Sequence, residues 1–170
     1  MILRKQLAKG LIRYRYESVQ RGLKFFNLNS ATTAGILWTG QDYTAFEGLV
    51  KVLEQNQIKW TDLCFTDNKH MPQTVNAISK KDFSLTRKPK SALILSFINA
   101  KFDLFFDISL SSSSYAQVIR RLSKASLKAG WSDTVPDFFD FRLDVSKCPE
   151  PFFLVEQLTH YLSEIKTKEA

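Results

Sequence analysis

Hydroxyl side chains crowd one short stretch of the sequence, where Ser109 and the four consecutive serines at 111–114 flank Leu110. The stretch lies between an apolar run typical of a strand and a segment with helical spacing. Backbone N–H groups at the start of a helix, together with serine hydroxyls, can hold a phosphate or a carboxylate. The same serines can also simply cap the helix, because each hydroxyl can accept a hydrogen bond from the first turn. Both interpretations stay open.

Two further loops, after the predicted strands at 34–39 and 126–130, carry residues suited to ligand binding. Ligands of doubly wound sheets bind outside the carboxyl ends of the strands, so these loops and the serine stretch would border one crevice. The candidate ligand-binding residues are Thr39, Gly40, Asp42, Ser109, Ser111, Ser112 and Trp131. Such a crevice suits a small anion or a ligand similar to a nucleotide sugar.

No residues have the spacing of a catalytic or metal site. Asp103 and Asp107 lie four apart in the most apolar run, so they point to one face of a strand at opposite ends. Neither a glycine-rich nucleotide motif nor a nucleophile elbow occurs. Cys64 and Cys148 are far apart, which predicts buried free thiols, and we expect no metal and no cofactor. These observations favour a non-enzymatic protein over an enzyme and nominate no catalytic residue.

Positive charge is concentrated at the N-terminus. The chain of 170 residues has a net charge of +7, yet residues 1–26 hold seven Lys and Arg against one Glu, a net of +6. The rest holds 17 basic and 16 acidic residues, a net of +1. Leu3, Leu7, Leu11 and Tyr14 recur at helical spacing with basic residues opposite, which predicts a basic amphipathic N-terminal helix.

The polar face of this helix is a candidate membrane or partner surface, with Lys9, Arg13, Arg21 and Lys24 as its contact residues. Three alternatives stay open: docking on its own domain or a second copy in a homodimer, attachment to an anionic membrane surface, and binding to RNA or an acidic partner. Nucleic acid is the least favoured partner. The absence of an 18-residue apolar run and of a secretory signal predicts a cytoplasmic protein, with the inner membrane surface as an alternative location.

Apolar patterning predicts strands alternating with helices through the rest of the chain. The predicted strands are residues 34–39, 59–66, 79–85, 102–110, 126–130 and 138–145. The predicted helices are residues 43–55, 90–99, 111–124 and 152–165, with Arg120 and Arg121 on the outer face of the third. This alternation indicates a doubly wound, Rossmann-like α/β fold with a mainly parallel sheet. We divide the chain into a helix with its connector at 1–28 and a single α/β domain at 29–170.

Three motifs carry a resemblance to a known family: FDLFFDISL at 102–110, LSKASLKAGW at 122–131 and FDFRLDV at 139–145. With them the chain resembles a family of uncharacterised proteins from Bacteroidota, a domain of unknown function, which implies no activity. A fainter similarity is to the N-terminal Rossmann-like half of heptosyltransferase-type glycosyltransferases, through residues 102–107 and 125–130. Those enzymes bind the nucleotide sugar mainly through a second domain, and this chain ends before one begins, so no catalytic residue carries over.

Two functional hypotheses follow. The first is a non-enzymatic interaction module whose basic N-terminal helix docks on a partner or an anionic membrane surface. The alternative is a binder of a small anion or of a nucleotide-sugar-like ligand, or an enzyme, that works at the strand-end crevice.

Overall fold

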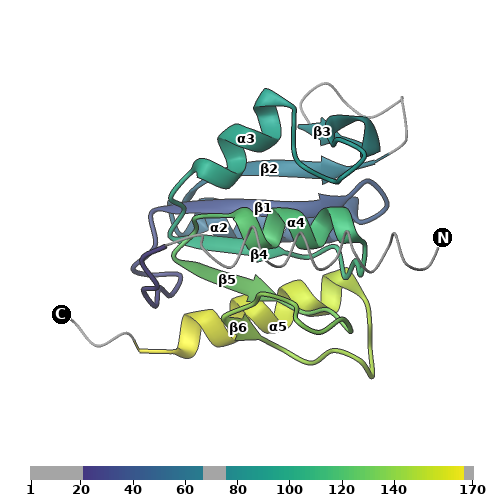
Figure 1. Cartoon of the computed structure of the whole chain (residues 1–170). Coiled ribbons are helices and arrows are strands. Elements are labelled where there is room, and N and C mark those ends of the chain that lie inside the picture. Colours follow the sequence, from purple (N-terminus) through teal and green to yellow (C-terminus); the bar gives the residue numbers. More distant parts are fainter. Residues whose placement is uncertain (1–20, 67–75, 167–170) are drawn as a thin grey trace.

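The computed structural model describes residues 21–66 and 76–166, and every structural statement below concerns these residues. Its centre is a sheet of six parallel strands in the order β3-β2-β1-β4-β5-β6 (Figure 1). The strands are β1 (Thr33–Thr39), β2 (Lys59–Phe65), β3 (Ala77–Ile78), β4 (Leu104–Asp107), β5 (Leu127–Gly130) and β6 (Phe141–Arg142). The strands predicted at 34–39, 59–66, 102–110 and 126–130 are confirmed, although β4 is shorter than expected.

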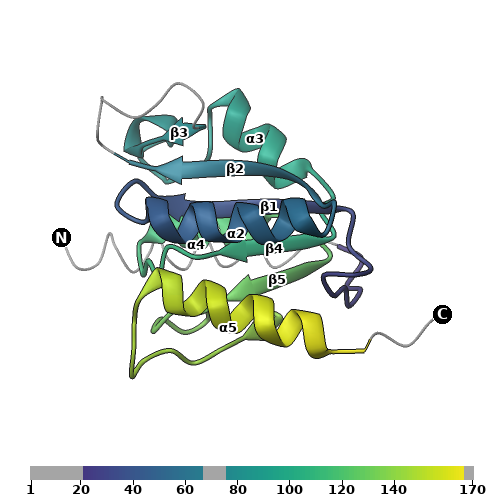
Figure 2. The same cartoon turned by 180° about the vertical axis from the view of Figure 1, so that it is seen from behind.

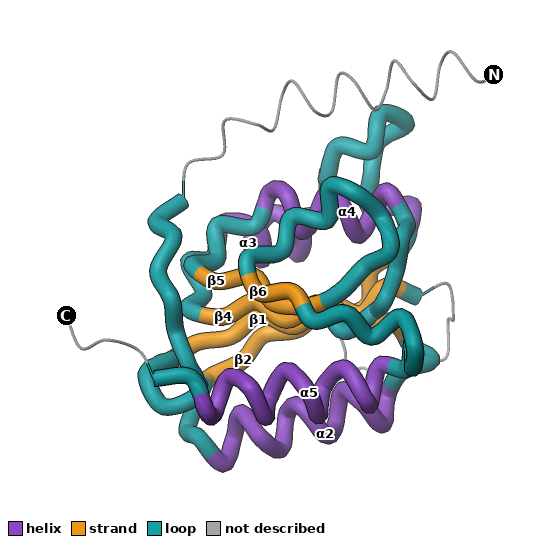
Figure 3. Tube along the Cα trace, turned by 90° about the horizontal axis from the view of Figure 1, so that it is seen from below, coloured by secondary structure: helices purple, strands orange, loops and turns teal. Residues whose placement is uncertain are grey.

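Four α-helices of the described chain cover the sheet in two layers (Figure 3). α2 (Tyr43–Gln55) and α5 (Pro151–Glu164) lie side by side on one face (Figure 2), while α3 (Ala92–Asn99) and α4 (Ser114–Leu122) cover the other. Each helix turns an apolar stripe to the sheet, as its spacing predicts. The doubly wound, Rossmann-like α/β fold is therefore confirmed.

The two central strands, β1 and β4, mark the place where the strand order reverses. From β1 the chain runs outward to β3, then returns to β4 beside β1 and continues to β6. All four residues of β4 are buried, as expected of a strand covered on both faces. The carboxyl ends of β1 and β4 are therefore the place where a fold of this kind positions a ligand.

The prediction of an edge strand at residues 79–85 is wrong. Strand β3 ends at Ile78, and Ser79 begins a single 3-10 turn, Lys80–Asp82. The Ser79 hydroxyl accepts a hydrogen bond from the Lys81 N–H at 3.3 Å, and the Asp82 carboxylate accepts one from the Ser79 N–H at 2.8 Å. Because these local bonds replace strand pairing, the chain leaves the sheet here.

The strand predicted at residues 138–145 pairs with β5 only at Phe141–Arg142. On either side of this pair, carboxylates form local turns: Asp137 accepts from the Phe139 N–H at 3.2 Å, and Asp144 accepts from the Ser146 N–H at 2.8 Å. These turns shorten the strand, because the backbone donors they use are no longer free for the sheet.

The predicted N-terminal helix does not extend over residues 21–26, which have no helical structure. Long-range contacts hold this segment instead. The guanidinium of Arg21 donates to the carbonyl oxygens of Ala125 and Ser126 at 3.2 and 3.0 Å and forms an ion pair with Asp140. The rest of that prediction, with Lys9 and Arg13, lies outside the described residues.

Candidate functional site

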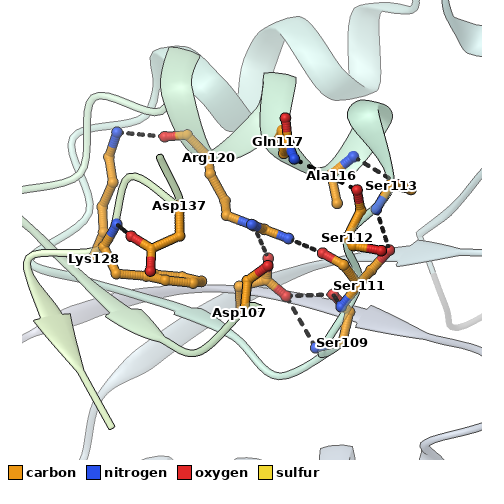
Figure 4. A network of polar contacts seen from close by, with 12 residues as sticks. Asp107, Ser109, Ser111, Ser112, Ser113, Ala116, Gln117, Arg120, Lys128 and Asp137 are labelled. Atoms are coloured by element: carbon orange, nitrogen blue, oxygen red, sulfur yellow. Dashed lines mark hydrogen bonds and ion pairs between the residues drawn. The ribbon is translucent and has the colours of Figure 1, made fainter. Parts of the chain in front are cut away.

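The carboxyl end of β4 places a buried carboxylate at the reversal of the sheet. Asp107 is the last residue of β4, and its side chain is 1 % exposed. It accepts hydrogen bonds from the N–H and the hydroxyl of Ser109 at 2.9 and 2.5 Å. Its other oxygen forms an ion pair with the guanidinium of Arg120 (Figure 4). Ion pairing compensates the large cost of burying a carboxylate away from water.

The prediction that Arg120 lies on the outer face of its helix is wrong. Its side chain is 0 % exposed and points from α4 to the strand ends (Figure 4). Nη2 donates to the Ser111 carbonyl, while the ring of Phe139 lies 5.1 Å from the guanidinium carbon. Helical spacing alone could not identify this arginine as buried, because its carboxylate partner lies 13 positions earlier in the chain.

The serine stretch forms a chain of local hydrogen bonds that leads into α4 (Figure 4). The Ser111 N–H donates to the Ser109 hydroxyl at 3.2 Å, and the Ser113 N–H donates to the Ser111 hydroxyl at 3.1 Å. Ser113 caps α4 by accepting from the Ala116 N–H at 3.2 Å. Capping is therefore what this part of the serine stretch does in the structure. Ser112, a predicted ligand-binding residue, is exposed, and its carbonyl accepts from the Gln117 amide at 3.5 Å.

The remaining predicted ligand-binding residues lie at or just after the ends of β1 and β5, and Thr39 lies beside the carboxyl end of β4, because Leu37 of β1 pairs with Asp107. Thr39 and Asp42 hydrogen bond to each other around the turn that contains Gly40. Burial raises the pKa of the Asp42 carboxyl, and the hydrogen bond from Thr39 acts in the opposite direction. Trp131 is 9 % exposed and belongs to the apolar core under α2 and α5. A shallow hollow of about 580 Å³ lies along α2 instead, between Trp60 and Phe152.

A buried lysine hydrogen bonds to the carbonyl oxygens at the C-terminal end of α4. Lys128 of β5 is 3 % exposed, and its ammonium donates to the carbonyl oxygens of Arg120 and Arg121, the latter at 3.5 Å. Desolvation, reinforced by the nearby charge of Arg21, lowers the pKa of Lys128 from 10.5 to about 7. Burial has the opposite effect on the Cys64 thiol, whose pKa rises from 9.0 to about 12.

We expect the free energy of unfolding to rise by about 1–2 kcal/mol between pH 7 and pH 9. In this window the unfolded Lys128 binds a proton that the folded one does not, so raising the pH favours the folded state. Above pH 9 the Cys64 thiol opposes this trend, because only the unfolded chain loses that proton. Urea unfolding at several pH values measures the effect. Lys128→Met should flatten the profile, whereas a matched Lys124→Met variant that also flattens it would contradict the assignment.

A basic hairpin, residues 80–90, projects from the chain after β3. It contains five basic residues, Lys80, Lys81, Arg87, Lys88 and Lys90, against the single acidic Asp82. Sequence reasoning missed this cluster because it counted the domain outside residues 1–26 as a whole, where acidic residues elsewhere cancel these charges. A count in short windows reveals it.

The charges of the two helix layers have opposite signs. α2 and α5, with Glu150 directly before α5, carry five glutamates against Lys51. On the other face, α3 and α4 contain no acidic residue, and α4 contributes Arg121, since Arg120 is buried in its ion pair with Asp107. The basic hairpin adds to this second face, because Phe83 packs in the core under α3 and α4. The helices of the two layers therefore differ in the sign of their charge, and the loop with Asp133 and Asp137 adds acidic residues beside α4.

No group of three or more His, Cys, Asp or Glu in residues 21–66 and 76–166 is arranged to hold a metal ion. None of the helices described is both long and apolar enough to cross a membrane. Cys64 is buried and Cys148 is half-buried, and both are free thiols.

The strand order and the polar carboxyl edge define a doubly wound α/β protein with Rossmann-like topology. The chain belongs to a family of unknown function, DUF6913, whose model matches residues 1–165. Comparison with curated proteins found no match, and neither did comparison with solved structures. The predicted membership of an uncharacterised family is confirmed, whereas the Bacteroidota origin and the glycosyltransferase similarity stay predictions.

Proposed function

We propose that this protein is an interaction module that attaches peripherally to anionic membrane surfaces through its α3–α4 side. The observation that carries the proposal is the separation of charge between the two helix layers, with glutamates on α2 and α5 and basic residues on the opposite side. An anionic bilayer attracts the basic layer and repels the acidic one, so it orients the domain as well as binding it.

The basic N-terminal segment supports the same orientation. Residues 1–20 hold five basic residues against Glu17, a net charge of +4. The chain after this segment is fixed beside the end of α4, where Arg21 bonds the Ala125 and Ser126 carbonyls. Arg21, the residue that follows the segment, is therefore held on the same side of the sheet as α4. Membrane attachment that combines two separate signals is stronger than attachment through one.

The strand-end residues support an interaction module over an enzyme. Asp107, Arg120, Ser109 and Ser111 bond to one another, and Thr39 bonds to Asp42. Groups engaged in this way hold loops in place. The Ser109 hydroxyl does donate to the Asp107 carboxylate, but the ion pair with Arg120 stabilises that carboxylate in its charged form and so makes it a weaker general base. Ligand binding at the crevice, the alternative hypothesis, stays a prediction.

The full chain should co-sediment with vesicles that contain 30 mol % phosphatidylserine at about 0.05 M salt and much less at about 0.5 M salt, because salt screens the attraction. Each basic residue near an anionic surface contributes about 1 kcal/mol, so Lys88→Glu should weaken binding about 30-fold. The matched Lys51→Glu variant makes the same charge change on the acidic layer and should leave binding within about twofold of wild type.

Failure of the full chain to sediment with these vesicles at low salt would overturn the proposal. Equal losses of binding in the Lys88→Glu and Lys51→Glu variants would also overturn it, because binding would then depend on the net charge of the protein and not on the side that carries the charge. Equal binding to neutral phosphatidylcholine vesicles would show that anionic lipid is not required, which contradicts the electrostatic basis of the proposal.

A further inference from the structure

One side chain of the basic hairpin is left without any protein contact. Leu85 is 105 % exposed, which is the largest exposure among the large hydrophobic residues of the described chain. Within five positions on either side lie all five basic residues of the hairpin. Burying a fully exposed leucine side chain is favourable by about 1.5–3 kcal/mol. This combination needs an occupant that offers both an apolar interior and negative charge.

Hydrogen bonds within the hairpin fix the backbone of the turn from which Leu85 projects. The Ser84 N–H donates to the Lys88 carbonyl at 2.9 Å, and the Arg87 N–H donates to the Ser84 carbonyl at 2.8 Å. The Ser84 hydroxyl accepts from the Lys88 N–H at 3.0 Å. Below this turn, Phe83 pairs with Pro89 in an antiparallel bridge and is only 4 % exposed. Leu85 therefore projects from a turn whose backbone is already fixed, so little ordering entropy is lost on binding.

The hairpin is also attached to the basic layer. The ring of Phe83 lies 5.0 Å from the ring of Tyr115 in the first turn of α4, in an edge-to-face arrangement. The guanidinium of Arg87 lies 5.9 Å from the same tyrosine ring. Arg21 is bonded beside the other end of α4, so the hairpin and Arg21 contact the domain near opposite ends of this helix.

We propose that Leu85 is the insertion point of the protein in an anionic bilayer, with the surrounding lysines and Arg87 at the level of the lipid headgroups. The inference rests on the proposed function and specifies which part of the basic side enters the membrane. The apolar region of the headgroup and acyl boundary buries the leucine, while phosphate and carboxylate groups pair with the cations. A nucleic acid supplies only the negative charge, and the tip of the hairpin has no exposed aromatic ring on which a base would stack.

The first experiment compares vesicle binding of Leu85→Ser, Tyr161→Ser and wild-type full-length protein, with vesicles of 30 mol % phosphatidylserine. Leu85→Ser should weaken binding about tenfold and keep its salt dependence, because the charges are unchanged. Tyr161 is 44 % exposed on α5 in the acidic layer, so Tyr161→Ser should bind like wild type. An unchanged affinity of Leu85→Ser would overturn the inference, and thermal unfolding checks that each variant folds.

The second experiment reports insertion directly. Leu85→Cys, in a Cys148→Ser background where Cys64 is buried, is labelled with an environment-sensitive nitrobenzoxadiazole dye. Its emission should shift to the blue and rise at least twofold on vesicle addition, and a label at Tyr161→Cys should not respond. Vesicle binding without a response at 85 overturns the insertion but leaves the proposed function intact. Absence of vesicle binding overturns both, and retained binding to an RNA oligonucleotide by Leu85→Ser would then assign the hairpin to nucleic acid.

Discussion

Replacing Arg120 with methionine is expected to lower the free energy of unfolding by about 3–5 kcal/mol, the largest effect we predict for a single substitution. The variant leaves the Asp107 carboxylate buried without its cation, and it removes the bond to the Ser111 carbonyl and the contact with Phe139. Burying an unpaired charge costs more than an ion pair contributes, so the loss exceeds that of ordinary packing changes. Urea unfolding followed by circular dichroism measures it.

Two further variants test the reason for this loss. Asp107→Asn combined with Arg120→Met removes both charges, and we expect it to be at least about 1 kcal/mol more stable than Arg120→Met alone. Arg142→Met breaks an ion pair with Asp137 at 3.1 Å in which the arginine is 45 % exposed, and it should cost less than about 1 kcal/mol. Equal stability of the double variant and Arg120→Met would show that the buried charge is not the cause.

Gly130→Ala is expected to destabilise the protein by about 1–3 kcal/mol, because the added methyl group has no space. A Cβ at this position would lie 2.7 Å from the Asp107 carbonyl oxygen and 2.6 Å from the ring of Phe139. The carbonyl is part of β4 and cannot move away, so the ring that covers Arg120 must shift. The same variant should therefore disturb the packing of Phe139 over Arg120, visible as chemical-shift changes of both residues by NMR.

Gly48→Ala is the matched control for this steric argument. A Cβ on Gly48 of α2 would meet the Phe152 ring at 3.5 Å, an ordinary van der Waals distance. Alanine favours a helix over glycine, so this variant should stabilise the protein by about 0.5–1 kcal/mol. A loss of stability in Gly48→Ala, or none in Gly130→Ala, would contradict the geometry at these two positions.

These expectations separate two roles on the basic side of the molecule. The buried Asp107 and Arg120 hold the serine stretch and the start of α4 in place, so their loss should reduce stability. Leu85 and Lys88 lie on the surface, so their variants should change membrane binding and leave the unfolding free energy within about 0.5 kcal/mol.

Local pattern in the sequence determined much of the fold. The helix at 43–55 was predicted with its true bounds, because its apolar residues repeat at helical spacing between a turn and Asn56. The buried strands were predicted because short apolar runs bounded by polar turns are typical of a parallel sheet. These features depend on neighbours within a few positions, which a single sequence contains.

Only the tertiary structure decided the site. Arg120 lies beside another arginine in a sequence that looks like a solvent-exposed helix face, and its burial depends on Asp107, which the fold brings to it. Arg21, predicted to face a membrane, bonds to carbonyls more than 100 positions away. Residues 79–85, which include the first half of the basic hairpin, were predicted as an edge strand, because the sequence pattern does not reveal that Ser79 and Asp82 bond locally. In each case the contact depends on residues that the fold brings together or on local side-chain hydrogen bonds. The periodicity of apolar residues carries no information about either.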